Sequence, residues 1–81
     1  MEKSIHSKRY KVFLTVLRDE RTKAGLSQEE LADRIDESQS FVSKCERGER
    51  RIDVAELLQF CMAIGSSFQG FCAKFEKAVK K

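Results

Sequence analysis

The sequence has little of what several classes of protein require. Its 81 residues include no proline, and 36% of them are charged while 41% are hydrophobic. This balance is typical of a soluble helical protein and excludes collagen-like and broadly disordered chains. No apolar run approaches the roughly 20 residues that span a membrane, and residues 1–9 lack the apolar core of a signal peptide. We therefore expect a single cytoplasmic domain over residues 1–81, with no membrane contact and a core small enough to profit from oligomerisation.

Residues that catalyse reactions or bind metals are also scarce. The chain has one histidine, His6, and three cysteines, Cys45, Cys61 and Cys72. The cysteines are spaced too widely and irregularly for a zinc knuckle or a thioredoxin-type pair, and one histidine completes neither a zinc site nor a cysteine nucleophile pair. We expect reduced thiols at apolar helical positions, no metal, no cofactor and no enzyme activity. Cys72, on an outer helix, leaves an interface or redox role open.

Residues 26–51 predict two short amphipathic helices joined by a three-residue turn. The first helix begins with a capping box, in which the Ser27 hydroxyl accepts the amide of Glu30 and the Glu30 side chain reaches back. The second helix begins after Ser38, a good helix cap, and ends at Gly48, which suits a left-handed C-terminal cap. This pattern predicts a helical hairpin with a tight joint.

The exposed side of the second predicted helix is polar. Within its first two turns, four residues point away from the apolar side: Gln39, Ser40, Ser43 and Lys44. Glutamine can pair with adenine, lysine can donate to guanine, and serine can serve donor or acceptor sites on base edges. These residues are therefore our candidates for reading DNA bases.

Residues suited to the phosphate backbone surround this helix. Residues 38–52 carry four cations and two anions, although residues 27–37 carry one cation and five anions. A run of charge is usually a solvated face, but these cations follow the helix directly and lie where phosphates would pass. The candidates at the helix ends and just beyond them are Gln28, Ser38, Arg47, Arg50 and Arg51.

Three segments carry the most specific pattern in the chain: Leu26-Ser27-Gln28-Glu29-Glu30-Leu31-Ala32, Ser38-Gln39-Ser40-Phe41-Val42-Ser43-Lys44 and Glu46-Arg47-Gly48-Glu49-Arg50. In order and spacing they resemble the Cro/cI (xenobiotic-response-element, XRE) helix-turn-helix family of bacterial and phage regulators. The likeness covers roughly residues 9–68, with the motif at about residues 27–47. It implies a compact all-α, five-helix, lambda-repressor-like domain whose second motif helix enters the major groove. It also implies an ion pair between Arg21 and Glu46.

Two residues in the turn depart from the pattern of this family. Asp36 stands where the family usually has glycine, and aspartate is among the few other residues that tolerate a positive φ. Glu37 stands where the family commonly places a small or aliphatic residue between the helices. Because burying an unpaired carboxylate is costly, we expect Glu37 to reach solvent or a cation.

Helical spacing predicts three further helices. The first begins at about Ser7 and runs to Gly25. A fourth follows its cap Asp53 and ends at Gly65. We expect this fourth helix to bury Leu57, Leu58, Cys61 and Ile64. The last helix covers about residues 67–80.

The last predicted helix carries an apolar stripe: Phe68, Phe71, Cys72, Phe75 and Val79. One interpretation is that the stripe completes a monomeric core, and for Phe68 and Cys72 we favour it. The other is a homodimer to which Phe71, Phe75 and Val79 contribute, because three phenylalanines are a large apolar surface for the end of a small chain. Two-fold pairing would place two reading helices roughly 34 Å apart, which matches a palindromic operator.

Together these features predict a sequence-specific regulator of transcription that binds double-stranded DNA. We expect a dimeric repressor or autoregulator that reads an operator through the major groove. The alternative is an antitoxin or other protein-interaction module that binds a partner, such as a toxin, through its phenylalanine-rich C-terminal helix. An enzyme is the least favoured class, because serine, cysteine and carboxylate residues occur without an orienting histidine or a catalytic spacing.

Overall fold

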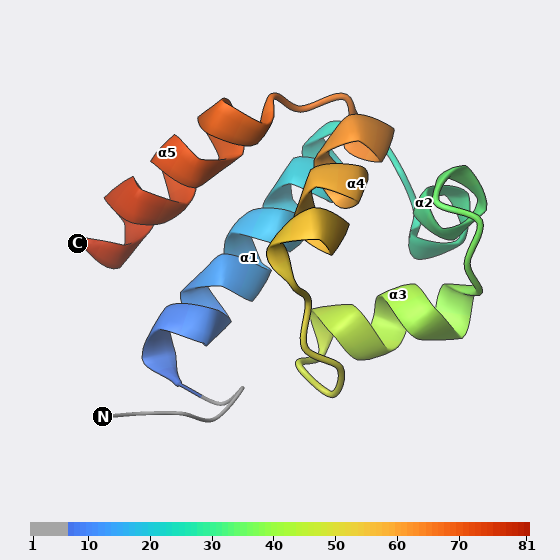
Figure 1. Ribbon diagram of the computed structural model, residues 1–81, viewed down its shortest axis with the longest axis horizontal. Coiled ribbons are helices and arrows are strands. Elements are labelled where there is room, and N and C mark those ends of the chain that lie inside the picture. Colours follow the sequence, from blue (N-terminus) through green and yellow to red (C-terminus); the bar gives the residue numbers. More distant parts are fainter. Residues whose placement is uncertain (1–6) are drawn as a thin grey trace.

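The computed structural model of the chain describes residues 7–81, which form five helices and no strand (Figure 1). The helices are α1 (Lys8–Lys23), α2 (Gln28–Arg34), α3 (Gln39–Glu46), α4 (Val54–Ile64) and α5 (Phe68–Val79). The all-α fold with five helices expected from the sequence is confirmed. In Figure 1, α5 lies alongside α1, while α2 and α3 form a pair at the other end of the molecule.

Each helix begins at a residue whose side chain satisfies a free backbone amide. The five capping residues are Ser7, Ser27, Ser38, Asp53 and Ser67. Full capping boxes form at α2 and α4, where Glu30 and Glu56 also accept the amide of the capping residue. A cap of this kind stabilises a helix by about 1 kcal/mol, so these short helices start at defined residues. The starts predicted after Ser27, Ser38 and Asp53 are confirmed.

The turn between α2 and α3 has the geometry that its sequence requires. Asp36 has a φ of 58°, and it is the one residue other than glycine with positive φ between residues 7 and 81. The amide of Glu37 donates to the carbonyl of Ala32 over 2.9 Å, which closes the end of α2. The Glu37 side chain is exposed, so its carboxylate stays hydrated, which is the first of the two outcomes expected for it.

One apolar core lies between all five helices. Its most deeply buried side chains are Leu17, Leu31, Val42, Cys45, Phe60, Cys61 and Phe71. Burial raises the pKa of the Cys61 thiol to about 11, because the thiolate would lose its hydration. Cys45 and Cys61 are therefore inert core residues. Cys72 is exposed, so our expectation that it completes the core was wrong.

The structure corrects our expectation for α4. Leu58 is 44% exposed instead of buried, and Phe60, which we did not predict, is 1% exposed. The helix is apolar on nearly every side, so its periodicity could not indicate which side faces the core. Packing against α2 and α5 decides the matter.

The structure also corrects the assignment of Phe71 to a surface between two copies. Phe71 is 1% exposed, and its ring meets the edge of Phe13 with a centroid distance of 5.8 Å. Phe75 packs against the same Phe13 ring at 5.7 Å and is partly buried, as is Val79. Most of the stripe on α5 therefore faces α1, and a second copy could reach only Phe75 and Val79.

Two further results concern the part of the chain that the structure describes. Within residues 7–81, no helix is both long and apolar enough to cross a lipid bilayer. Over the same residues, no three histidine, cysteine, aspartate or glutamate side chains come together as a metal site would require. The prediction for His6, and the part of the signal-peptide prediction that concerns residues 1–6, lie outside this range.

Candidate nucleic-acid interface

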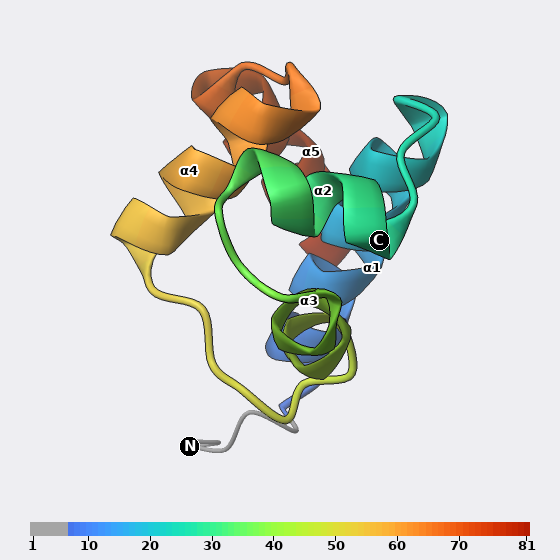
Figure 2. The ribbon, with the colours of Figure 1, turned by 90° about the vertical axis from the view of Figure 1, so that its right-hand side faces the viewer.

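The outward side of α3 carries the residues that we predicted to read bases. Gln39, Ser40 and Lys44 are exposed and Ser43 is half-buried. Val42 and Cys45, on the opposite side of the helix, are fully buried. Figure 2 looks nearly along α3, which lies at the lower part of the molecule below α2. The four polar side chains therefore share one accessible face of one helix.

A buried ion pair fixes the inner side of α3. Glu46 is buried and accepts hydrogen bonds from Nε of Arg21 over 2.6 Å and from Nη2 over 3.0 Å. Nη1 of Arg21 donates to the carbonyl of Leu26 over 2.8 Å. The predicted pair is present, and it joins α1, α3 and the residues just before α2. Such two-pronged contacts fix orientation as well as distance.

Gln28 connects this ion pair to the outward face. Its Nε2 donates to Oε1 of Glu46 over 2.9 Å, and its Oε1 accepts from Nε2 of Gln39 over 2.7 Å. The carbonyl oxygen and second N–H of Gln39 are not used by these contacts. An adenine edge needs one donor and one acceptor from an amide, so Gln39 is held with the required groups available. Gln28 is thus placed to position Gln39.

Arg47 and Ser43 form a second polar unit beside this one. Nη1 of Arg47 donates to the Ser43 hydroxyl over 2.6 Å, and Nε of Arg47 donates to Glu49 over 2.7 Å. The hydrogen bond that Arg47 donates to Glu49 raises the pKa of Arg47, and the same contact lowers the pKa of Glu49. Exposed ion pairs of this kind are weak because water screens them, so the contact with Glu49 leaves Arg47 able to exchange it for another anion.

Arg50 differs from Arg47 because its contacts are within the fold. Its guanidinium donates to both oxygens of Glu56, over 3.0 and 2.7 Å, and lies 4.7 Å from the centre of the Phe41 ring. The hydrogen bond from Arg50 is the main cause that lowers the pKa of Glu56. Arg50 therefore ties the loop after α3 to the first turn of α4. The sequence did not indicate this role.

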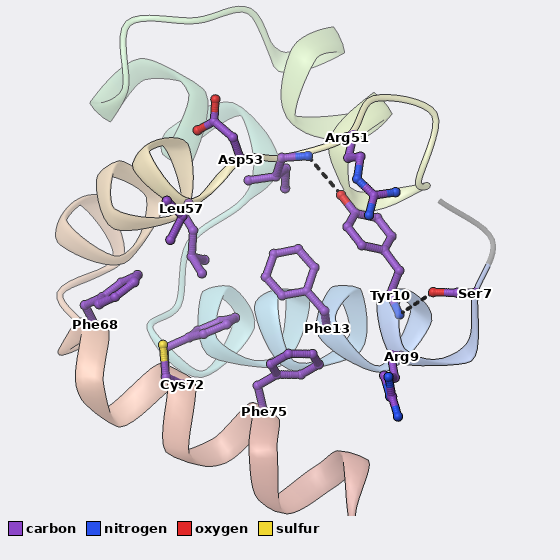
Figure 3. Close-up of a pocket in the computed structure, with 13 residues that line it drawn as sticks. Ser7, Arg9, Tyr10, Phe13, Arg51, Asp53, Leu57, Phe68, Cys72 and Phe75 are labelled. Atoms are coloured by element: carbon purple, nitrogen blue, oxygen red, sulfur yellow. Dashed lines mark hydrogen bonds between the residues drawn. The ribbon is translucent and has the colours of Figure 1, made fainter. Parts of the chain in front are cut away.

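The remaining candidates lie at the ends of the interface. Ser38 caps α3, where its hydroxyl accepts the amide of Phe41 over 3.1 Å. Arg51 is exposed, with its guanidinium 5.0 Å from the centre of the Tyr10 ring, and Figure 3 shows the two side chains together. The Tyr10 hydroxyl in turn accepts the amide of Ile52 over 2.9 Å. The loop that carries Arg51 is thereby fastened to α1.

The sequence analysis missed one cation next to this site. The guanidinium of Arg18 lies 3.8 Å from Glu46, and its side chain is exposed. Arg18 belongs to α1, far from the motif in sequence. No spacing in the sequence marks it, because only the packing of α1 against α3 brings it there.

Comparisons with known proteins agree with this geometry. The helix-turn-helix family profile HTH_3 matches residues 17–71. An XRE-family like protein from Pseudomonas syringae pv. tomato str. DC3000 is 45% identical, with 90% of this chain and 89% of that chain covered and a TM-score of 0.83. The restriction-modification controller protein C.AhdI from Aeromonas hydrophila is 31% identical over 82% of this chain and 99% of its own, with a TM-score of 0.69.

A further structure shares the fold at lower identity. A mutant of the restriction-modification controller protein C.Esp1396I is 23% identical, with 93% of this chain and 100% of that chain covered and a TM-score of 0.87. No curated protein matches the chain. The family profile covers more than half of the residues, and the structures share the five-helix arrangement. The chain therefore belongs to the helix-turn-helix family of Cro/cI (XRE) type, whose members are DNA-binding regulators of transcription and not enzymes.

Proposed function

We propose that the protein reads a specific sequence of double-stranded DNA by placing α3 in the major groove. The observation that carries this proposal is the chain of hydrogen bonds from Arg21 through Glu46 and Gln28 to Gln39. It fixes a base-reading amide on the outward face before any DNA arrives. Preorganised groups bind more tightly, because less side-chain freedom is lost on association.

The proposed contacts divide into two groups. Gln39, Ser40, Ser43 and Lys44 would contact base edges, because they share the outward face of α3. Gln28, Ser38, Arg47, Arg50 and Arg51 would meet the sugar-phosphate backbone, because they lie at the ends of α2 and α3 and in the following loop. The bidentate contact with Glu56 makes Arg50 the weakest member of the second group, so we expect its main effect on the shape of the loop.

The regulatory role is proposed by analogy with the relatives. Two of the similar structures are described as restriction-modification controller proteins, and a third, ClgR from C. glutamicum, as a regulator of the clp gene. We infer a repressor or autoregulator that acts as a homodimer on a palindromic operator in the bacterial cytoplasm. A homodimer suits this purpose because two-fold symmetry in the protein matches two-fold symmetry in the operator.

The alternative function, binding of a toxin through α5, is not favoured by the contacts of that helix. It depended on exposed phenylalanines, but Phe71 is buried and Phe75 packs on Phe13. Co-purification of an unrelated small protein with the wild-type chain would favour this alternative function again.

Selection from a pool of random duplexes tests the proposal directly. We expect enrichment of one palindromic sequence, and Arg47→Ala should weaken binding to every duplex. Loss of one phosphate contact should also reduce the slope of log affinity against log salt concentration by about 1. Lys77→Ala, which removes the same charge from α5, is the matched control and should leave the slope unchanged. Failure to enrich any sequence would contradict specific reading by α3.

A further inference from the structure

We infer that Arg18 of α1, a helix that precedes the helix-turn-helix motif, binds the DNA backbone beside Gln28. The inference rests on the proposed function, because it extends the interface built around α3 to a further helix. It also states where the contact falls on DNA. The phosphate that Arg18 binds is either the one that meets Gln28 or the next one on the same strand.

Arg18 approaches the buried ion pair of α3 without being needed by it. Its Nε lies 3.8 Å from Oε1 of Glu46, which is longer than a hydrogen bond. The same carboxylate already accepts two hydrogen bonds from Arg21, over 2.6 and 3.0 Å, so its charge is compensated. The Arg18 guanidinium can therefore turn to another anion while Arg21 continues to hold Glu46.

The two arginines of α1 that surround Glu46 differ in exposure. The side chain of Arg21 is 10% exposed, whereas that of Arg18 is 56% exposed. Water screens the long contact of Arg18 with Glu46, so this contact holds the guanidinium only weakly. An exposed guanidinium presents several N–H groups in a plane, which suits the oxygens of a phosphate. Arg21 is thus the structural partner, and Arg18 is accessible to a duplex.

Arg18 and Gln28 meet at a single oxygen atom. Nε2 of Gln28 donates to Oε1 of Glu46 over 2.9 Å, and this is the oxygen that Arg18 approaches. The two side chains are therefore neighbours, although they belong to different helices. On its other side, Gln28 accepts the hydrogen bond from Gln39. Arg18 thus lies one side chain beyond the amide that positions Gln39.

The side of α1 that carries Arg18 is compatible with a polyanion. Four exposed residues lie in one line along it: Lys11, Thr15, Arg18 and Thr22. The line contains two cations, two hydroxyl groups and no carboxylate. A backbone that passed along it would meet no negative charge from these four residues.

The proposed position of the DNA brings one strand to this side of α1. A helix in the major groove has a sugar-phosphate backbone on each of its flanks. Gln28 is proposed to meet the backbone on the flank of α3 where α2 begins, and Arg18 lies next to Gln28 on the same flank. In Figure 2, both α1 and α2 lie close to α3. Arg18 and Gln28 therefore face the same strand.

The salt dependence of binding provides the first test, both on the selected palindrome and on an unrelated duplex. Arg18→Ala should weaken binding to each of them roughly tenfold. It should also reduce the slope of log affinity against log salt concentration by about 1. Arg9→Ala is the matched control, because it removes the same charge from the opposite side of α1, where Arg9 lies beside Phe75 and Val79 of α5. Equal effects of the two variants would overturn the inference, because net charge alone would then explain them.

Urea denaturation separates a contact with DNA from a structural role. Arg18→Ala should leave the urea midpoint unchanged, because Arg21 still holds Glu46. Arg18→Lys should restore most of the affinity and the salt slope, because lysine keeps the charge at the same place. An Arg18→Ala protein that is clearly less stable, and whose affinity Arg18→Lys does not restore, would overturn the inference.

Uncharged phosphates locate the contact on DNA. We would replace the phosphates of the selected half-site one at a time with methylphosphonate. At one position the wild type should lose affinity while Arg18→Ala loses none, because a change on either side of one contact removes the same interaction. The same series with Gln28→Ala should identify the same phosphate or its neighbour on that strand. A position for Arg18 on the other strand, or no such position, would overturn the inference.

Failure of this inference can be distinguished from failure of the proposed function. If selection enriches no sequence, specific reading by α3 is contradicted, but the salt slope on the unrelated duplex still decides whether Arg18 binds the backbone. If selection enriches a palindrome and Arg18→Ala binds it with the wild-type affinity and salt slope, the inference is overturned and base reading by α3 remains.

Discussion

Two successive helices of this protein, α3 and α4, differ on both of their sides. The inner side of α3 includes a buried carboxylate, Glu46, whereas the inner side of α4 is apolar and centred on Phe60. The outward side of α3 presents amide, hydroxyl and ammonium groups, whereas that of α4 presents Val54, Leu58 and Met62. A polar face that stays hydrated suits the edges of base pairs, and an uncharged apolar face suits another protein. The two helices therefore differ in the chemistry of their outward sides as much as in that of their inner sides.

The largest effect should come from the inner side of α3. Glu46→Gln would leave the guanidinium of Arg21 buried without its carboxylate, and breaking one partner of a buried pair costs about 3–5 kcal/mol of stability. Urea denaturation followed by circular dichroism measures this loss. Glu49→Gln, which removes an exposed and water-screened ion pair, should cost far less. Equal losses from the two variants would mean that the buried pair does not anchor α3.

The next effect concerns the outward side of α3. Gln39→Ala should keep the fold but lose about 1–3 kcal/mol of discrimination at one base pair of each half-site. Repeating the duplex selection with this variant should show that one position has become degenerate. Gln69→Ala removes the same group from an exposed position on α5 and should leave the selected sequence unchanged. If both variants weaken all sequences equally, α3 does not read bases through Gln39.

A smaller loss of stability should come from α5, which an ion pair between Lys74 and Glu20 attaches to α1. The hydrogen bond from Lys74 is the main cause that lowers the pKa of buried Glu20, and a hydrogen bond from Ser66 adds to it. Since the pKa is lower in the folded state, this contribution is present above the ordinary value of 4.5 and is lost as the pH falls through the lowered value.

Glu20→Gln should therefore reduce stability by about 1 kcal/mol at neutral pH and flatten its dependence on pH below the ordinary carboxyl range. Unfolding curves of wild type and variant at neutral and acidic pH provide the measurement. The two proteins should converge in acid. A difference that persists at low pH would show that the variant acts through packing and not through charge.

The smallest effect on the free fold should come from the outward side of α4. Met62→Gln should change the stability of the monomer by less than about 0.5 kcal/mol, because an exposed side chain loses few contacts. Phe60→Leu, on the inner side of the same helix, should cost more than about 1 kcal/mol. Thermal unfolding at low protein concentration compares them. A large loss from Met62→Gln would mean that this residue supports the fold of the single chain.

The sequence predicted the motif better than the helices around it. The caps at Ser27 and Ser38 and the positive φ of Asp36 depend on contacts within a few residues, so their signals are local. Our prediction of which side of α4 faces the core was wrong at Leu58. A helix with so many apolar residues has no polar side that would indicate its orientation. The assignment of Phe71 to a dimer surface was wrong because Phe13 of α1, which is distant in sequence, packs against it.

The candidate site shows the same division. The outward face of α3 follows from helical periodicity, so the sequence alone could place Gln39, Ser40 and Lys44 on that face. The contacts of Gln28 with Glu46 and of Arg50 with Glu56 could not, because side-chain hydrogen bonds of this kind depend on the final positions of the helices.

The sequence by itself determined where the helices begin and end, which residues form the motif, and the family to which the chain belongs. These properties rest on capping hydrogen bonds and on a 3.6-residue period, both of which act over a few residues. Only the tertiary structure decided that Glu20 meets Lys74, that Gln28 holds Gln39, and that Val54, Leu58 and Met62 remain uncovered. These outcomes depend on how whole helices pack together, and burial is a property of that packing and not of any residue alone.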